Sequence, residues 1–214
     1  MPELPEVQTV VNDLKNKIVG YQIKKVYNPN NYINVLENGS LTTYQKFLTK
    51  QTIQSIFRRG KYIILQLDNG FLLFHLRMTG QIILNNISLN DLKYVSFKMA
   101  FNDKQSLFFK DVRKFGKIYI SDTLNWLENK IGIEPLSDIF NPKWMYDQLK
   151  NKQRLIKPFL LDQSYIAGLG NIYADEALWI SRIHPKAITA KISKKKAHAL
   201  CYAIKDVLTT AIKY

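Results

Sequence analysis

Three residues at the amino terminus have the types and spacing for acid-assisted attack on an electrophilic carbon. Pro2 is small enough for Met1 to be removed, which would expose the proline nitrogen as a free secondary amine. The pKa of an α-amino group is near ~7.7–8, against ~10.4 for lysine, so part of it is a neutral nucleophile at physiological pH. Glu3 and Glu6 follow closely, and a carboxylic acid beside a sugar can protonate the ring oxygen or a leaving group. A simpler interpretation is that acidic residues favour helix amino termini for electrostatic reasons.

An amphipathic helix is predicted to hold this segment. Apolar residues recur at spacings of three and four, which is one face of a helix: Leu4, Val7, Val11, Leu14 and Ile18. Pro5 suits the first turn, and Gly20 suits a position just past the end.

The rest of the chain divides into a β-rich part and a helix-rich part. Short β-type runs between turn signals predict strands at Tyr62–Leu67, Phe71–Leu76, Tyr94–Phe101 and Ser106–Lys110. Beyond Trp126, helical periodicity predicts helices at Lys143–Leu149, Pro158–Asp162, Asp175–Ser181 and Lys194–Ile212. We therefore predict an α+β protein, with a two-layer antiparallel β-sandwich flanked by helices over residues 1–130 and an all-α domain over residues 131–214.

The composition of the chain indicates which kinds of partner, metal site and cellular location are compatible with it. The net charge is +14 and hydrophobic residues make up 46% of the chain, so it is predicted to fold and to meet a polyanion, with nucleic acid the first candidate. A generally lysine-rich composition would explain the charge without any partner. Cys201 is the single cysteine, which excludes an internal disulfide and a multi-cysteine zinc site within this sequence. No apolar run is long enough to span a membrane and no signal peptide is evident, so a cytoplasmic location is expected.

A series of short motifs, in a fixed order along the chain, indicates a protein family. Met1-Pro2-Glu3-Leu4-Pro5-Glu6-Val7 is followed by Arg59-Gly60-Lys61-Tyr62, His75-Leu76-Arg77-Met78-Thr79-Gly80, Asp111-Val112-Arg113-Lys114-Phe115-Gly116, Leu160-Leu161-Asp162-Gln163, the segment Gly168 to Leu178, and Ile183-His184-Pro185. The chain resembles the formamidopyrimidine-DNA glycosylases, bacterial enzymes that excise oxidised purines, along nearly its whole length.

The resemblance implies a catalytic role for four residues. Pro2 would be the Schiff-base nucleophile that attacks C1′ of the damaged nucleotide, and Glu3 would be the acid that assists sugar opening. Glu6 matches a glutamate that helps to order the site. Lys61 matches a lysine that contacts phosphate and transfers a proton during β-elimination. The implied activity is bifunctional: removal of 8-oxoguanine and formamidopyrimidines, followed by apurinic/apyrimidinic lyase cleavage through β- and δ-elimination.

The resemblance also implies residues that bind DNA. A base inside a duplex must be rotated out before it can be reached, and the gap must then be filled. Met78, Arg113 and Phe115 match the residues that fill it, which suits two apolar wedges and a planar donor for the widowed base. Gly170 and Asn171 match the phosphate-binding turn of a helix–two-turns–helix module. Lys157 matches a basic residue near the lesion.

The expected partner is damaged double-stranded DNA at the bacterial nucleoid, bound by a monomer without an obligatory protein partner. No cofactor is expected in this chain, because the family's structural zinc lies in a C-terminal finger that this sequence does not contain. Val112, Tyr94 and Gln153 depart from the family pattern, where proline, histidine and lysine are usual, and Gln8 replaces an acidic residue.

Three alternatives remain open. The first is the preference for oxidised pyrimidines of the related endonuclease VIII group, against which Leu4 and the positions of Arg113 and Phe115 argue. The second is a truncated, non-catalytic remnant that only binds damaged DNA. The third, a nucleic-acid module of ribosomal type, explains the charge but not the amino-terminal residues, and it predicts binding without a covalent intermediate.

Overall fold

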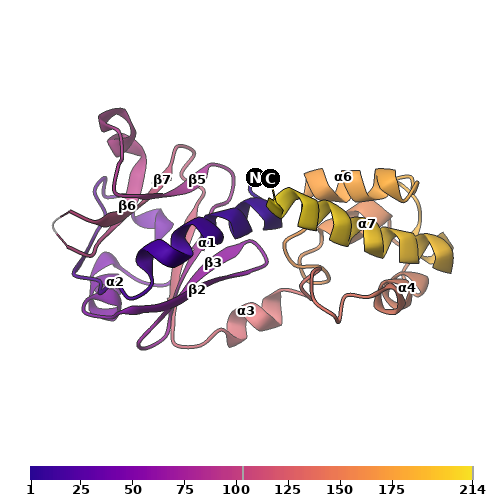
Figure 1. The fold of residues 1–214 in the computed structure, drawn as a ribbon, viewed down its shortest axis with the longest axis horizontal. Coiled ribbons are helices and arrows are strands. Elements are labelled where there is room, and N and C mark those ends of the chain that lie inside the picture. Colours follow the sequence, from indigo (N-terminus) through magenta and orange to yellow (C-terminus); the bar gives the residue numbers. More distant parts are fainter. Residues whose placement is uncertain (103, 214) are drawn as a thin grey trace. The chain divides into compact units, whose positions relative to one another are not determined.

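The computed structural model describes residues 1–102 and 104–213, which form two compact units (Figure 1). The β-rich unit contains Met1–Pro2 and Val7–Leu124, and the helical unit contains Glu3–Glu6 and Asn125–Tyr214. The domain boundary predicted after residue 130 stays a prediction; the compact β-rich unit ends at Leu124, and the first turn of the first helix groups with the helical unit. No helix among the described residues is long and apolar enough to cross a membrane.

The β-rich unit is built from two antiparallel sheets of four strands each. The first sheet has the order β1 (Lys25–Tyr27), β6 (Val95–Ala100), β7 (Ser106–Asp111), β5 (Gly80–Leu84). The second has the order β2 (Ile53–Arg59), β3 (Tyr62–Leu67), β4 (Phe71–His75), β8 (Lys117–Ser121). Helices α1 (Leu4–Ile18) and α2 (Leu41–Leu48) and the short 3-10 turns η1 (Ile33–Val35) and η2 (Leu89–Tyr94) complete this part of the chain.

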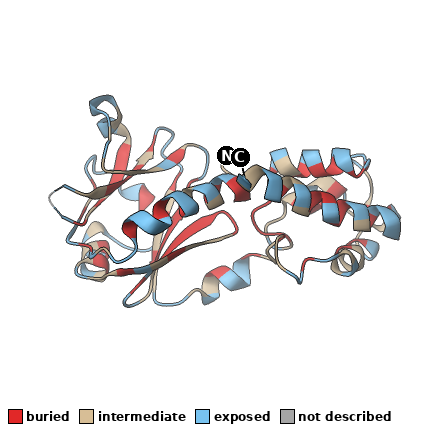
Figure 2. Cartoon of the chain, viewed as in Figure 1, coloured by how far each residue is buried: buried red, intermediate tan, exposed pale blue. Residues whose placement is uncertain are grey.

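Large aromatic side chains hold the two sheets together. Phe74 on β4 packs against Phe97 on β6 and Phe109 on β7, with ring centroids 6.1 and 5.7 Å apart, and all three are buried. The predicted apolar stripe of α1 is also buried, and exposed residues lie on the opposite face of the helix (Figure 2). The two-layer β-sandwich is therefore confirmed, with its core between the sheets.

Two short loops cross from one sheet to the other, and they lie together. Residues 76–79 connect β4 in the second sheet to β5 in the first, while residues 112–116 connect β7 in the first sheet to β8 in the second. Strands β5 and β7 are hydrogen-bonded neighbours, with Gly80 opposite Asp111 at the point where both loops begin or end. The sandwich topology thus brings together two motifs more than thirty residues apart in the sequence.

The helical unit surrounds a separate core. Its helices are α3 (Asn125–Lys130), α4 (Pro142–Lys150), α5 (Ile156–Leu161), α6 (Asn171–Ile180) and α7 (Lys194–Lys213), with the 3-10 turn η3 (Thr189–Lys191). Helices α6 and α7 pack side by side, and α4 packs on α7 (Figure 1). Leu4 belongs to this core, so the first turn of α1 is part of the unit's packing.

Candidate active site

The carboxylate of Glu3 is held at the amino terminus of α6. Its Oε1 accepts a hydrogen bond from the backbone N–H of Ile172 at 2.9 Å, and its Oε2 accepts one from that of Tyr173 at 3.4 Å. The first N–H groups of a helix have no partner within the helix and attract negative charge. Gly170, at the capping position of α6, has no side chain to serve them, so Glu3 supplies the cap from a distant part of the sequence. Glu3 is only 3% exposed, and its orientation is consequently fixed.

Two glycines give the amino-terminal segment room to reach α6. A Cβ atom on Gly170 would lie 2.3 Å from Cδ of Glu3, and one on Gly168 would lie 2.8 Å from Cβ of Leu4. Gly168 also has a φ of +86°, and its carbonyl accepts the N–H of Leu4 at 3.0 Å. The glycine-rich turn was expected to approach a phosphate; in this structure its close neighbours are Glu3 and Leu4. The predicted DNA contacts of Gly170 and Asn171 stay predictions, and the Asn171 side chain is exposed at the first position of α6.

Gly170→Ala is expected to slow base excision at least tenfold, because the added methyl group must displace the Glu3 carboxylate. The measurement is the single-turnover excision rate on duplex DNA that contains 8-oxoguanine. Gly70→Ala is the matched control: its Cβ would lie 2.7 Å from the backbone oxygen of Ser121, at the turn between β3 and β4 of the β-rich unit. The control should lower the melting temperature and leave the rate of the folded protein unchanged. Equal rates for Gly170→Ala and the parent would contradict the prediction.

Glu6 links the same segment to α6 a second time. Its Oε2 accepts the backbone N–H of Glu3 at 2.7 Å, which is the reciprocal half of a capping box at the start of α1. Its Oε1 accepts the hydroxyl of Tyr173 at 2.6 Å. Burial and the neighbouring Glu6 both raise the pKa of Tyr173, so the phenol stays protonated and remains the donor. The sequence analysis assigned no role to Tyr173, although it lies within one of the motifs.

A buried aspartate orders the two crossover loops. Asp111 is 1% exposed; one of its oxygens accepts the Thr79 hydroxyl and the N–H of Arg113, and the other accepts the N–H of Gly116 at 2.6 Å. Thr79 Oγ1 in turn accepts the N–H of Arg113 at 3.1 Å. Sequence reasoning missed this role; the available signal was a short acidic side chain just before a turn, where such residues accept backbone N–H groups.

The ordered loops present the three predicted gap-filling residues to solvent. Met78 is 44% exposed and Phe115 49% exposed, which is unusual for large apolar side chains, and the guanidinium of Arg113 lies 5.1 Å from the centre of the Phe115 ring. Met78 and Phe115 line a hollow of about 880 Å³ in the β-rich unit, together with Met1 and Lys114. The structure thus brings Met78, Arg113, Phe115 and the amino-terminal residue to one region of this unit.

The two predicted lysines have different surroundings. Lys61 is buried in the turn between β2 and β3, although a lysine there would ordinarily be solvated. Lys157 on α5 is half-buried, and its ammonium group lies 2.8 Å from a carboxylate oxygen of Asp175 on α6. Its charge is therefore shared with a carboxylate within the helical unit, and its DNA contact stays a prediction.

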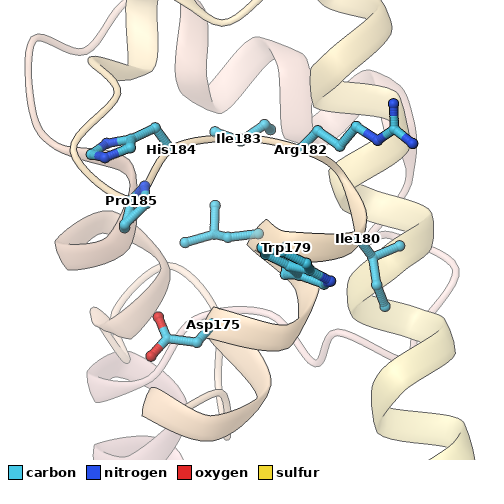
Figure 3. A pocket seen from close by; sticks show the side chains of 8 residues that line it. Asp175, Trp179, Ile180, Arg182, Ile183, His184 and Pro185 are labelled. Carbon is cyan, nitrogen blue, oxygen red and sulfur yellow. The ribbon is translucent and has the colours of Figure 1, made fainter.

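A second hollow, of about 830 Å³, lies at the carboxyl end of α6 (Figure 3). Its lining includes Trp179, Ile183, His184 and Pro185, and Trp179 is 83% exposed. Tyr173 lies at the opposite end of the same helix. None of the predicted site residues is among the described residues that line this hollow, so the predicted chemistry is placed elsewhere.

The described residues do not suit a metal site. They contain no group of three or more histidine, cysteine, aspartate or glutamate side chains placed to bind an ion. Cys201 is buried on α7, its thiol points to the carbonyl oxygen of Phe140 at 3.9 Å, and burial raises its pKa to about 11. A thiol that stays protonated is a poor zinc ligand.

Family models and known proteins match both parts of the chain. Residues 1–118 match the formamidopyrimidine-DNA glycosylase N-terminal domain, and residues 131–214 match the formamidopyrimidine-DNA glycosylase H2TH domain, the helix–two-turns–helix module. The formamidopyrimidine-DNA glycosylase of Protochlamydia amoebophila is 39% identical, over 100% of this chain and 77% of its own length. That of Lactococcus lactis subsp. cremoris is 40% identical, over 100% of this chain and 79% of its own length.

Solved structures of formamidopyrimidine-DNA glycosylases are also similar to this chain. The chain is similar to the Lactococcus lactis enzyme in complex with DNA containing an abasic site, with a TM-score of 0.91 and 38% identity over 99% of this chain and 78% of the other. It is equally similar to MutM in complex with DNA containing carbocyclic 8-oxoguanine, with a TM-score of 0.91 and 37% identity over 99% and 80% of the two chains. The chain therefore belongs to the formamidopyrimidine-DNA glycosylase family.

Proposed function

We propose that this protein removes oxidised purines, such as 8-oxoguanine and formamidopyrimidines, from double-stranded DNA and then cleaves the abasic strand as a lyase. The observation that carries the proposal is the fixed position of the Glu3 carboxylate. Glu3 directly follows Pro2, which becomes the free amino terminus when Met1 is removed. A nucleophilic amine and an oriented carboxyl group on adjacent residues are the two groups that the reaction requires.

The first step would join the amine to the sugar. Glu3 delivers a proton to the ring oxygen as the C1′–O4′ bond opens, and the lone pair of the base nitrogen forms a transient double bond to C1′. The lone pair of the neutral Pro2 nitrogen then attacks C1′, and the Pro2 nitrogen passes its proton to the base. The bond from C1′ to the base breaks, its electron pair leaves with the protonated base, and the Pro2 nitrogen lone pair forms the cationic iminium with C1′. No redox or nucleotide cofactor enters this scheme, because the amine itself stores the positive charge.

The second step would cleave the strand. Removal of a proton from C2′ expels the 3′ phosphate with its bonding electron pair, and water finally hydrolyses the iminium to free the amine. We assign the proton transfer to Lys61. The burial of this side chain supports the assignment, because a buried lysine has a restricted position from which to transfer a proton.

DNA binding would use groups from both units. Met78 and Phe115 would take the place of the extruded base in the stack, and Arg113 would offer its donors to the unpaired cytosine. Asn171 would bind a phosphate at the amino terminus of α6, and Lys157 would supply charge nearby. The net charge of +14 supports a polyanionic partner. We propose that the protein acts as a monomer on the DNA of a bacterial cytoplasm.

Borohydride trapping tests the function. The protein, with loss of Met1 confirmed by mass spectrometry, is mixed with a duplex that contains 8-oxoguanine opposite cytosine and is reduced during the reaction. A covalent complex through Pro2 is expected, and none with an undamaged duplex. Trapping that is faster on a thymine glycol duplex would instead favour a pyrimidine preference. Binding without any trapping would show a non-catalytic member of the family and would overturn the proposal.

A further inference from the structure

We infer that Tyr173 is a positioning residue for the amino-terminal amine: its hydroxyl holds Glu6, and Glu6 holds the backbone next to Pro2. The inference rests on the proposed function and adds to it a residue that acts through another.

The chain of contacts is short and continuous. The Tyr173 hydroxyl donates to Oε1 of Glu6 at 2.6 Å, and Oε2 of the same carboxylate accepts the N–H of Glu3 at 2.7 Å. That N–H belongs to the peptide bond that joins Glu3 to Pro2. The peptide is planar, so a single torsion of Pro2, its ψ angle, separates the fixed plane from the proline nitrogen. Fixing this plane therefore restricts the nitrogen to one arc.

Glu6 needs an external partner to do this. Its side chain is exposed, and a free glutamate side chain on a helix surface samples several rotamers. The Tyr173 hydroxyl selects the rotamer in which the second oxygen reaches back to the Glu3 N–H. Glu3 itself has separate support from the α6 backbone, so loss of the hydroxyl should release the Pro2–Glu3 peptide without releasing the Glu3 carboxylate.

The same turn of α6 is the proposed phosphate-binding turn. Asn171 lies two residues before Tyr173, on the exposed first position of the helix. The residues proposed to grip the DNA backbone and the residue that sets the amine are thus one rigid element. A phosphate bound at Asn171 and the nitrogen of Pro2 would both be positioned by the start of α6. This arrangement favours a high effective concentration of the amine at the sugar of the bound DNA.

Tyr173→Phe tests the inference with the whole chain. The variant keeps the ring and removes only the hydroxyl, so we expect the same DNA dissociation constant and melting temperature but single-turnover trapping about tenfold slower. Tyr202→Phe is the matched control, because it removes an exposed hydroxyl on α7 and should trap at the parent rate. In the Glu6→Ala background the hydroxyl has nothing to hold, so adding Tyr173→Phe should cause no further loss.

A second measurement does not depend on DNA. Hydrogen exchange of the Glu3 amide in the free protein should be about tenfold faster in Tyr173→Phe than in the parent, because its acceptor is no longer held. Trapping at the parent rate, or exchange at the parent rate, would overturn the inference. A parent protein that fails to trap overturns the proposed function alone, since faster exchange in the variant still establishes that Tyr173 fixes this peptide.

Discussion

A chain that keeps Met1 is expected to lose covalent trapping on 8-oxoguanine DNA by at least a thousandfold. Pro2→Leu produces such a chain, because the bulky residue prevents removal of Met1. The nitrogen of residue 2 then becomes an amide without a nucleophilic lone pair, and the free amine moves one residue outward, by about 3.8 Å between Cα atoms. A displacement of only about 1 Å from the productive position can already cost a factor of about a hundred.

The amine cannot slide back to compensate. The Leu4 N–H is bound to the carbonyl of Gly168 at 3.0 Å, and Glu3 is bound through its side chain and its own N–H, so the residues next to it have fixed positions. Trapping is followed on a gel, with mass spectrometry of the amino-terminal peptide to identify the attached residue. Lys15→Gln is the control that removes a different amine, on the exposed part of α1, and it should trap normally. Undiminished trapping by Pro2→Leu would contradict the prediction, and the attached peptide would show whether Met1 or a lysine forms the Schiff base.

Local patterns in the sequence were sufficient to predict some of the elements that position the site. The apolar stripe from Leu4 to Ile18 predicted α1 with both of its ends, and the predicted strand Tyr62–Leu67 is β3 without change. Both succeed because the burial of one face follows directly from the residue period. The pattern failed for α2, Leu41–Leu48, in which only Tyr44 and Leu48 are buried and two threonines weaken the helical signal.

The start of α6 could not be predicted from a local pattern, because it depends on a residue far away in the sequence. The sequence motifs assign Gly170 and Asn171 to a turn, and helical periodicity predicts a helix only from Asp175. The helix begins four residues earlier, at Asn171, because the carboxylate that caps it comes from Glu3. The sequence near Gly170 does not indicate this cap, because Glu3 and Ile172 are 169 residues apart.

The proximity of the gap-filling residues also depends on contacts between distant parts of the sequence. Met78 and Phe115 were identified by their motifs, but their proximity depends on two crossover loops that meet only because β5 pairs with β7. The buried Asp111 that ties the loops together belongs to the same motif as Phe115, and its role is visible only with its three partners, Thr79, Arg113 and Gly116, in place. Motifs identified the residues, whereas the sheet order explains why they act together.

Glu3→Gln is expected to slow excision of 8-oxoguanine at least a hundredfold, because glutamine cannot deliver a proton to the sugar oxygen. Glutamine also fits the α6 terminus poorly: it keeps one acceptor oxygen, while its NH₂ group would face one of the N–H donors that the carboxylate now binds. The measurement is the single-turnover excision rate, with the melting temperature recorded to separate a loss of the α6 cap from a loss of chemistry.

The decisive comparison uses two substrates. An abasic site is already an aldehyde in equilibrium with its ring form, so the amine can attack it without a proton from Glu3. Glu3→Gln should therefore cleave abasic DNA with a loss of less than about tenfold, and Glu176→Gln, an exposed change on α6, should act normally on both substrates. Equal losses on the two DNAs would mean that Glu3 serves only to cap α6. A loss confined to the intact lesion would mean that α6 orients a carboxyl group that opens the sugar of the damaged nucleotide, and that Pro2 and Lys61 carry the reaction after the base has left.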